Sequence, residues 1–258
     1  MRLSTRREML RRTGEAATLL ASGLPARGAA RESQSPPQAA TGRRLKIIVT
    51  GGHPGDPEYG CGGTIARYAD RGDEVVLLYL NNGEWPASKG GAPASTRIAE
   101  ASKACRTLKA RPTYAAQTNG NAVIDSSHFD EYRRILEAER PDVVFTHWPI
   151  DAHRDHRAIS ALTFDAWLKI GRKFALYYYE VSNGEDTLQF PPTHYVDITA
   201  TEPVKRDACY AHASQTPDKY YPLQDQVAKF RGIENGCARA EAFILQVQSP
   251  YEALPTAF

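Results

Sequence analysis

The feature that most limits the fold of this chain is a regular alternation of short apolar runs with segments of helical periodicity. Runs rich in β-branched residues predict strands at 45–50, 74–80, 112–116, 142–146, 174–181 and 195–198. Apolar residues at three- and four-residue spacing predict helices at 62–71, 95–108, 128–139, 156–168, 202–214 and 224–242. Such alternation is typical of a mainly parallel sheet with helices on both faces. We therefore expect a three-layer, Rossmann-like α/β fold.

The first 30 residues are predicted to be an export signal. Arg6 and Arg7 form a pair, residues 16–24 are a short apolar run, and small residues follow at 28–30. This order is typical of a twin-arginine leader, and the apolar run is too short to remain in a membrane as a spanning helix. We expect an exported bacterial protein, periplasmic or extracellular, without stable membrane insertion after the signal is removed. The alternative is a basic, amphipathic start to a cytoplasmic domain.

The remainder of the chain is expected to form one domain. Residues 31–42, rich in Ser, Pro, Gln and Ala, predict a disordered spacer, and residues 43–258 have a length that suits a single α/β domain. Residues 1–30 hold six arginines and two glutamates, so without them the formal charge changes from +2 to −2. This near-neutral charge gives no reason to expect nucleic acid as a partner. We expect a small-molecule or glycan substrate, and the sequence leaves the oligomeric state open.

The cysteines do not form a metal-binding pattern. There are four of them, at positions 61, 105, 209 and 237, without any C-x-x-C pair, which argues against a thiolate zinc site. An oxidising compartment would permit disulfides between them. The favoured interpretation is that most are small buried residues.

Two predicted strands are each followed by a segment rich in metal-ligand side chains. The strand at 45–50 continues into H-P-G-D at 53–56, and the strand at 142–146 is followed by D-A-H-R-D-H at 151–156. Ligands of open α/β sheets bind at the carboxyl ends of strands, so the two segments meet if these strands are neighbours. A lone histidine is usually a surface or core group, which is how we interpret the histidines at 128, 194 and 212. Two such motifs, each directly after a strand, favour a metal site.

The residue types in these motifs predict hydrolytic chemistry. A catalytic zinc ion usually has three protein ligands and an open position, and His53, Asp56 and His156 supply such a set. The ion lowers the pKa of its water and polarises a carbonyl, as hydrolysis of an amide or ester requires. His153 is placed to donate a hydrogen bond or proton, and Asp155 to orient a histidine. Zinc is favoured, although Fe²⁺ or Co²⁺ fits the same ligands.

A nucleotide site is the weaker interpretation of the glycines near the first motif. The chain has no G-x-G-x-x-G or Walker pattern there, and a histidine stands inside the turn.

The chain resembles a known family, the PIG-L/LmbE-like zinc-dependent de-N-acetylases, which are N-acetylglucosaminyl deacetylase-like. The resemblance covers about residues 45–246. It is carried by H-P-x-D-P-E-x-G-x-G-G-T at 53–64, Arg97 with Glu100, D-x-H-x-D-H-R at 151–157, the Tyr-rich strand ending at Glu180, V-D-I at 196–198 and R-A-E-A-F at 239–243. The resemblance implies an LmbE-like fold with zinc on His53, Asp56 and His156. It also implies that His153 stabilises the transition state and that Arg97 reaches the substrate.

One position departs from the family pattern. The family usually has H-P-D-D, whose first aspartate is taken as the general base, and this chain has Gly55 there. The base can be replaced by another carboxylate, with Asp151, Asp155 and Glu58 as candidates in that order, or His153 can act as both base and acid. The favoured hypothesis is a metal-dependent hydrolase that removes an acetyl group from the amide nitrogen of an N-acetylglucosamine-type sugar or glycoconjugate, with metal-bound water as nucleophile. The alternative is a non-catalytic metal- or carbohydrate-binding protein on the same fold.

Overall fold

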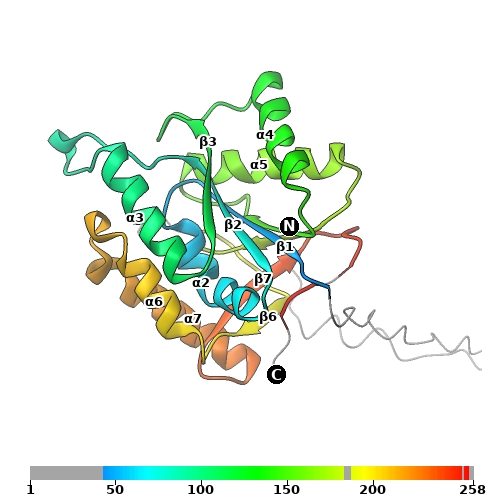
Figure 1. The fold of residues 1–258 in the computed structure, drawn as a ribbon. Coiled ribbons are helices and arrows are strands. Elements are labelled where there is room, and N and C mark those ends of the chain that lie inside the picture. Colours follow the sequence, from blue (N-terminus) through cyan, green and yellow to red (C-terminus); the bar gives the residue numbers. More distant parts are fainter. Residues whose placement is uncertain (1–42, 183–186, 252, 256–258) are drawn as a thin grey trace, which may run out of the picture. The chain divides into compact units, whose positions relative to one another are not determined.

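A seven-stranded sheet is the centre of the computed structural model, which describes residues 43–182, 187–251 and 253–255 (Figure 1). The strands are β1 (Lys46–Gly51), β2 (Glu74–Asn81), β3 (Arg111–Gln117), β4 (Val143–His147), β5 (Ala175–Tyr179), β6 (His194–Asp197) and β7 (Ala240–Leu245). Their order in the sheet is β3-β2-β1-β4-β5-β7-β6. The predicted export signal at 1–30 and spacer at 31–42 lie outside the described residues.

The sheet is mainly parallel, as predicted. Strands β1 to β5 run parallel to their neighbours, whereas β7 is antiparallel to both β5 and β6. After β3 the chain crosses to the other side of β1, so the strand order reverses between β1 and β4. These two strands pair in parallel, with Ile47 opposite Val143 and Val49 opposite Phe145. The crevice at such a reversal is where open α/β sheets bind ligands.

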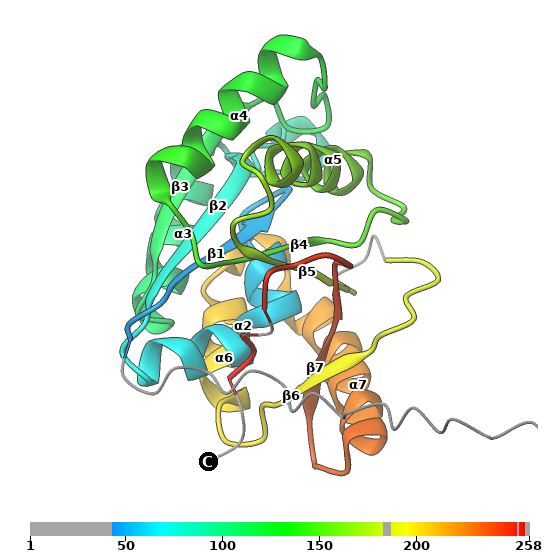
Figure 2. The same ribbon diagram turned by 90° about the vertical axis from the view of Figure 1, so that its right-hand side faces the viewer.

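Helices cover both faces of the sheet (Figure 2). They are α2 (Asp56–Asp70), α3 (Ala94–Thr107), α4 (Ser126–Glu139), α5 (Arg154–Lys169), α6 (Glu202–Tyr210) and α7 (Pro217–Asn235), with short 3₁₀ turns at Ala87–Lys89 and Ala213–Gln215. Helices α4 and α5 lie on one face, and α2, α3, α6 and α7 lie on the other (Figures 1 and 2). The three-layer α/β fold is therefore confirmed.

The apolar core is divided between the two faces by the alternation of each strand. In β1, Ile47 and Val49 pack with α2 and α3 residues, whereas Ile48 packs with residues of α4 and α5. Successive side chains of a strand point to opposite faces, which is why continuous apolar runs are needed in a strand buried on both sides. Both layers of helices are thus fixed by the central strands that also carry the two motifs.

The C-terminal part differs from the prediction. The expected helix at 224–242 is confirmed as far as Asn235 and is wrong beyond it: α7 begins earlier, at Pro217, and ends at Asn235, and β7 follows at Ala240. Proline suits the first turn of a helix, and Gly236 ends it with φ +73°, a conformation that glycine adopts readily. The helix expected from residue 62 also begins earlier, since α2 starts at Asp56.

Two further findings concern cysteine and membranes. The four cysteines carry free thiols; those at 61, 105 and 209 are buried, and that at 237 is partly exposed. In the described part of the chain, no helix combines the length and apolar character needed to cross a bilayer.

Candidate active site

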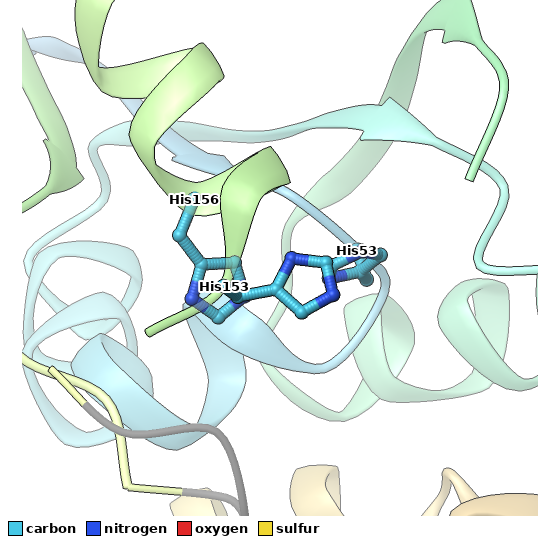
Figure 3. Close-up of side chains that lie close together, drawn as sticks. All are labelled: His53, His153 and His156. Atoms are coloured by element: carbon cyan, nitrogen blue, oxygen red, sulfur yellow. The ribbon is translucent and has the colours of Figure 1, made fainter. Parts of the chain in front are cut away.

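The pairing of β1 with β4 brings the two histidine motifs together. His53 lies in the turn after β1, and Asp56 is the first residue of α2. His147 ends β4, His153 is the N-cap of α5, and His156 lies in the first turn of α5. In Figure 3, the rings of His53, His153 and His156 lie close together, although they come from two separate segments. The sequence motifs therefore form one cluster at the carboxyl edge of the sheet.

Asp56 is at the centre of this cluster. Its Oδ2 lies 3.2 Å from His53 Nδ1, 3.1 Å from His156 Nε2 and 3.4 Å from His147 Nε2. The backbone N–H of His53 also donates to Oδ2, at 2.8 Å. The predicted ligand set of His53, Asp56 and His156 is thus assembled around one carboxylate.

Both predicted histidine ligands turn their other ring nitrogen toward a second carboxylate. His53 Nε2 lies 3.2 Å from Asp155 Oδ2, and His156 Nδ1 lies 3.0 Å from Asp151 Oδ1. A metal-bound histidine usually donates its other N–H to a carboxylate or carbonyl in this way. The arrangement directs His53 Nδ1 and His156 Nε2 toward Asp56, so these residues fit a divalent cation.

Two alternative donor groups overlap with this set. The ligand atoms of His53, His153 and His156 lie within 4.8 Å of one another, and so do those of Asp56, His147 and His156. His156 belongs to both groups. His147, which the sequence analysis left without a role, is fully buried and stacks on His156 with ring centroids 4.0 Å apart. Its position at the end of β4 is the sequence signal that would have identified His147 as a candidate site residue.

The charges of the cluster shift the pKa of its members strongly. Burial lowers the pKa of His156, but Asp56 and Asp151 outweigh burial and raise it to about 10. Burial likewise opposes a charged Asp56, yet His156 and His53 hold its pKa well below the ordinary value. For His147, burial and the neighbouring His156 together lower the pKa to about 4. The site therefore favours an ionised Asp56, a protonated His156 and a neutral His147. A metal cation can replace the proton on His156.

Asp151, the first candidate for the missing base, has both oxygens engaged. Oδ1 accepts the backbone N–H of His153 at 2.8 Å as well as the contact from His156, and Oδ2 accepts the hydroxyl of Thr187 at 2.9 Å. The side chain is completely buried. This geometry suits a role for Asp151 in orienting the imidazole ring of His156.

Asp155, the second candidate, is also held in place. Its Oδ2 accepts from Asn81 Nδ2 at 3.1 Å and from the backbone N–H of Gly120 at 2.7 Å, in addition to its contact with His53. Burial raises the pKa of Asp155, but the hydrogen bonds from His53 and Gly120 outweigh burial and lower it. Its geometry fits the predicted orientation of a histidine.

A cavity of about 470 Å³ opens beside the cluster. His53, Asp56, His153 and His156 line one side of it. Others along its wall are Trp85, Asn119, Gly120, Ser214, Gln215 and Tyr220. The volume is in the range of small-molecule sites in proteins.

His153 and Arg97 both line this cavity. His153 Nδ1 accepts the backbone N–H of Asp155 at 3.1 Å, so a neutral ring carries its proton on Nε2. Arg97 is buried, and its guanidinium donates to the carbonyls of Pro54 at 2.6 Å and Gly83 at 3.2 Å. Arg97, which was predicted to bind the substrate, therefore also fixes the turn that carries His53.

His212 is a cavity residue that sequence reasoning missed. It follows α6, is 1 % exposed, and its Nε2 lies 2.9 Å from Glu58 Oε1. Nothing in its local sequence predicts this, because only the packing of α6 against α2 brings it near Glu58.

The fold and the site together define a Rossmann-like α/β protein with a histidine–carboxylate cluster at the point where the strand order reverses. Comparison with known proteins agrees. Residues 48–167 match the PIG-L family, described as GlcNAc-PI de-N-acetylase. The diacetylchitobiose deacetylase of Thermococcus kodakarensis is 26% identical over 216 residues, which cover 76% of this chain and 81% of that protein. These similarities support the resemblance of this chain to the PIG-L/LmbE-like de-N-acetylase family.

Solved structures show the same fold. The conserved protein TT1542 from Thermus thermophilus has a TM-score of 0.69 and 27% identity, over 83% of this chain and 99% of that one. The N,N'-diacetylchitobiose deacetylase from Pyrococcus horikoshii has a TM-score of 0.67 and 24% identity, over 78% of this chain and 84% of that one.

Proposed function

We propose that this protein is a metal-dependent hydrolase that removes the acetyl group from the nitrogen of an N-acetylglucosamine-type sugar or glycoconjugate. The observation that carries the proposal is the convergence of His53 and His156 on Asp56, with both histidines oriented by further carboxylates at the wall of a cavity. The family, and the relative named for diacetylchitobiose, support an amide of an amino sugar as the bond that is cleaved.

The residues divide into those that would hold the ion and those that would act on the substrate. His53, Asp56 and His156 would hold Zn²⁺, or Fe²⁺ or Co²⁺, which suit imidazole and carboxylate donors. When bound, such an ion supplies a Lewis acid that polarises a carbonyl and lowers the pKa of water. His153 donates a hydrogen bond from Nε2 to the carbonyl oxygen as negative charge develops on it. Asp151 and Asp155 keep the histidine rings in the required orientation.

The cavity supports a saccharide substrate. Trp85 and Tyr220 lie on its wall, and Trp85 is 43% exposed, although Lys89 Nζ lies over its ring, 5.1 Å from the ring centroid. Aromatic side chains in a cavity pack on the apolar surface of a ligand, and polar groups then fix its orientation. Asn119 and Gln215 line the same cavity and supply such polar groups.

A second candidate function has one observation in its favour. Residue 55 is glycine, so a carboxylate at the position of the family's general base is absent, as in a protein that binds a metal or carbohydrate without turnover. The persistence of the orienting carboxylates and of His153 favours the hydrolase. Export of the mature protein is proposed on the twin-arginine pattern of residues 1–30.

Release of acetate and of the free amine tests the proposal. We expect turnover of N-acetylglucosamine, its disaccharide or a glycoconjugate by zinc-loaded protein, loss of turnover after chelation, and recovery when metal is restored. The variant His156→Ala is expected to lose turnover, whereas His128→Ala, at a partly exposed position outside the cavity lining, serves as the matched control and keeps it. Binding of the sugars without release of acetate under any metal would instead support the second function.

A further inference from the structure

The part of the cavity wall that follows α6 contains a strained backbone position. Ser214, Gln215 and Thr216 all line the cavity, and Thr216 has φ +55° and ψ +57°. This left-handed conformation is an outlier for a β-branched residue, because its Cβ lies too close to the neighbouring carbonyl oxygen. Such strain persists only where the surrounding structure enforces it, and it often occurs at ligand-binding sites.

No hydrogen bond of the Thr216 side chain explains this strain in the described part of the chain. Thr216 is the N-cap of α7, where a threonine hydroxyl usually accepts a backbone N–H of the first helical turn. The hydroxyl makes no such capping bond and has no other hydrogen-bond partner among the described residues. Glycine would fit this backbone without strain and would cap the helix about as well. What threonine adds at this position is therefore a side chain at the wall of the cavity.

Glu100 of α3 enforces the position of this turn. Its Oε1 accepts the backbone N–H of Ser214 at 2.7 Å, and its Oε2 accepts the hydroxyl of Ser214 at 2.8 Å. Oε2 also accepts an N–H of Arg97 at 3.0 Å, and Arg97 donates to the carbonyl of Pro54, the neighbour of His53. Hydrogen bonds thus tie the turn at 214–216 to the segment that carries the first predicted metal ligands.

We propose that Thr216 is a specificity-determining residue whose hydroxyl binds a hydroxyl group of the saccharide substrate. Thr216 is exposed and lines the cavity, so a ligand in the cavity can reach its side chain. A hydroxyl both donates and accepts hydrogen bonds, which suits pairing with the hydroxyl groups of a sugar. Glu100 is a positioning residue that holds the turn in place. The inference rests on the proposed function and adds a residue that recognises the sugar.

Two substitutions separate the hydroxyl from the backbone strain. Thr216→Val keeps the branched shape and the strain but removes the hydroxyl. We expect KM for N-acetylated saccharides to rise about three- to tenfold, the effect of one lost hydrogen bond, with little change in kcat. Thr216→Ser retains the hydroxyl and should keep the wild-type KM. A valine variant with the wild-type KM for every saccharide tested would overturn the inference.

Thr216→Gly tests the strain and the recognition together. Glycine adopts φ +55° readily, so the midpoint of urea unfolding should rise while KM rises as in the valine variant. Arg140→Gly is the matched control, because Arg140 is exposed, has φ +50° at the C-cap of α4 and lies outside the cavity lining. Its unfolding midpoint should rise with KM unchanged. A merely structural role for Thr216 would give both glycine variants this second result and would overturn the inference.

Binding of the deacetylated product provides a readout that does not depend on turnover. In calorimetric titrations of zinc-loaded protein with the glucosamine disaccharide, Kd should rise for Thr216→Val and Thr216→Gly but not for Thr216→Ser or Arg140→Gly. This pattern without acetate release by the wild-type protein would overturn the proposed function and support the role of Thr216. Acetate release with unchanged KM and Kd in the valine and glycine variants would overturn the inference and leave the proposed function intact.

Discussion

Gly55 has a backbone conformation that other residues rarely adopt. Its φ is +115° at the start of α2, where a side chain is strained whatever space surrounds it. The departure from the family pattern is therefore not a simple truncation, because the turn itself has taken a shape that suits glycine.

We predict that Gly55→Asp lowers stability and does not raise kcat. A non-glycine residue forced into such a region costs on the order of 1–3 kcal/mol, and the change is measured by urea unfolding. Gly72→Asp is the matched control: φ there is +91° in open space, so stability falls comparably and kcat is unchanged. A stable Gly55→Asp protein with a kcat raised about a hundredfold, the lower end of what a general base contributes, would contradict this prediction and show that a carboxylate at residue 55 can serve as the base.

Metal binding is predicted to release protons. The pKa of His156 is raised to about 10, so at pH 7 the ring is protonated and a cation must displace that proton. The apparent affinity for zinc should therefore increase with pH from about 6 toward 10. Calorimetric titration in buffers of different ionisation enthalpy measures the release. Zinc binding at pH 7 without proton release would contradict the assignment of His156 as a ligand.

At the scale of residues, the sequence predicted the ligand motifs because each follows a strand directly. It could not show that Asp151 and Asp155 have their oxygens engaged by groups such as Thr187 and Gly120, since those hydrogen bonds come from separate loops. The contact between His212 and Glu58 joins residues 154 positions apart, and no local pattern reports it.

At the scale of elements, the junction of α2, α6 and β7 depends on a buried ion pair. Lys205 Nζ lies 2.6 Å from Glu241 Oε1, and both side chains are almost fully buried. The same carboxylate accepts the backbone N–H groups of Gly63 at 2.9 Å and Thr64 at 2.8 Å within α2. The segment at 239–243 has the composition of a helix, so these tertiary contacts explain why the predicted helix at 224–242 is wrong there.

Removal of Glu241 is expected to destabilise the protein strongly. Glu241→Ala leaves the ammonium of Lys205 buried without its partner, which costs about 3–5 kcal/mol. Urea unfolding measures the loss. Lys229→Ala is the control, because Lys229 is half-exposed in its pair with Asp225 and such pairs contribute about 0–1 kcal/mol. Equal losses for the two variants would show that the buried pair has no special role.

The loop between β2 and α3 is predicted to contribute to substrate binding through Trp85. If the ring packs on a sugar, Trp85→Ala should raise KM about tenfold, equivalent to about 1.4 kcal/mol, with little change in kcat. Ile124→Ala, at an exposed apolar position outside the cavity lining, is the control. An unchanged KM for every saccharide tested would remove Trp85 from the binding surface.

At the scale of the whole molecule, the position of the site follows from the strand order. The sequence predicted the alternation of strands and helices and thus the α/β class, because apolar periodicity is local. It could not show that β1 pairs with β4, on which the convergence of the two motifs depends; the structure shows this pairing. The antiparallel β7, inserted between β5 and β6, was also not predicted, since its register depends on distant partners.

The central claim is that the paired ends of β1 and β4 hold a catalytic metal, and anomalous diffraction from zinc-loaded crystals tests it most directly. The account predicts one strong peak beside the cavity, at about 2.0–2.2 Å from His53 Nδ1, an Asp56 oxygen and His156 Nε2. A peak held by His147 and His153 without His53 and Asp56, or no peak at a zinc concentration that supports turnover, would contradict it.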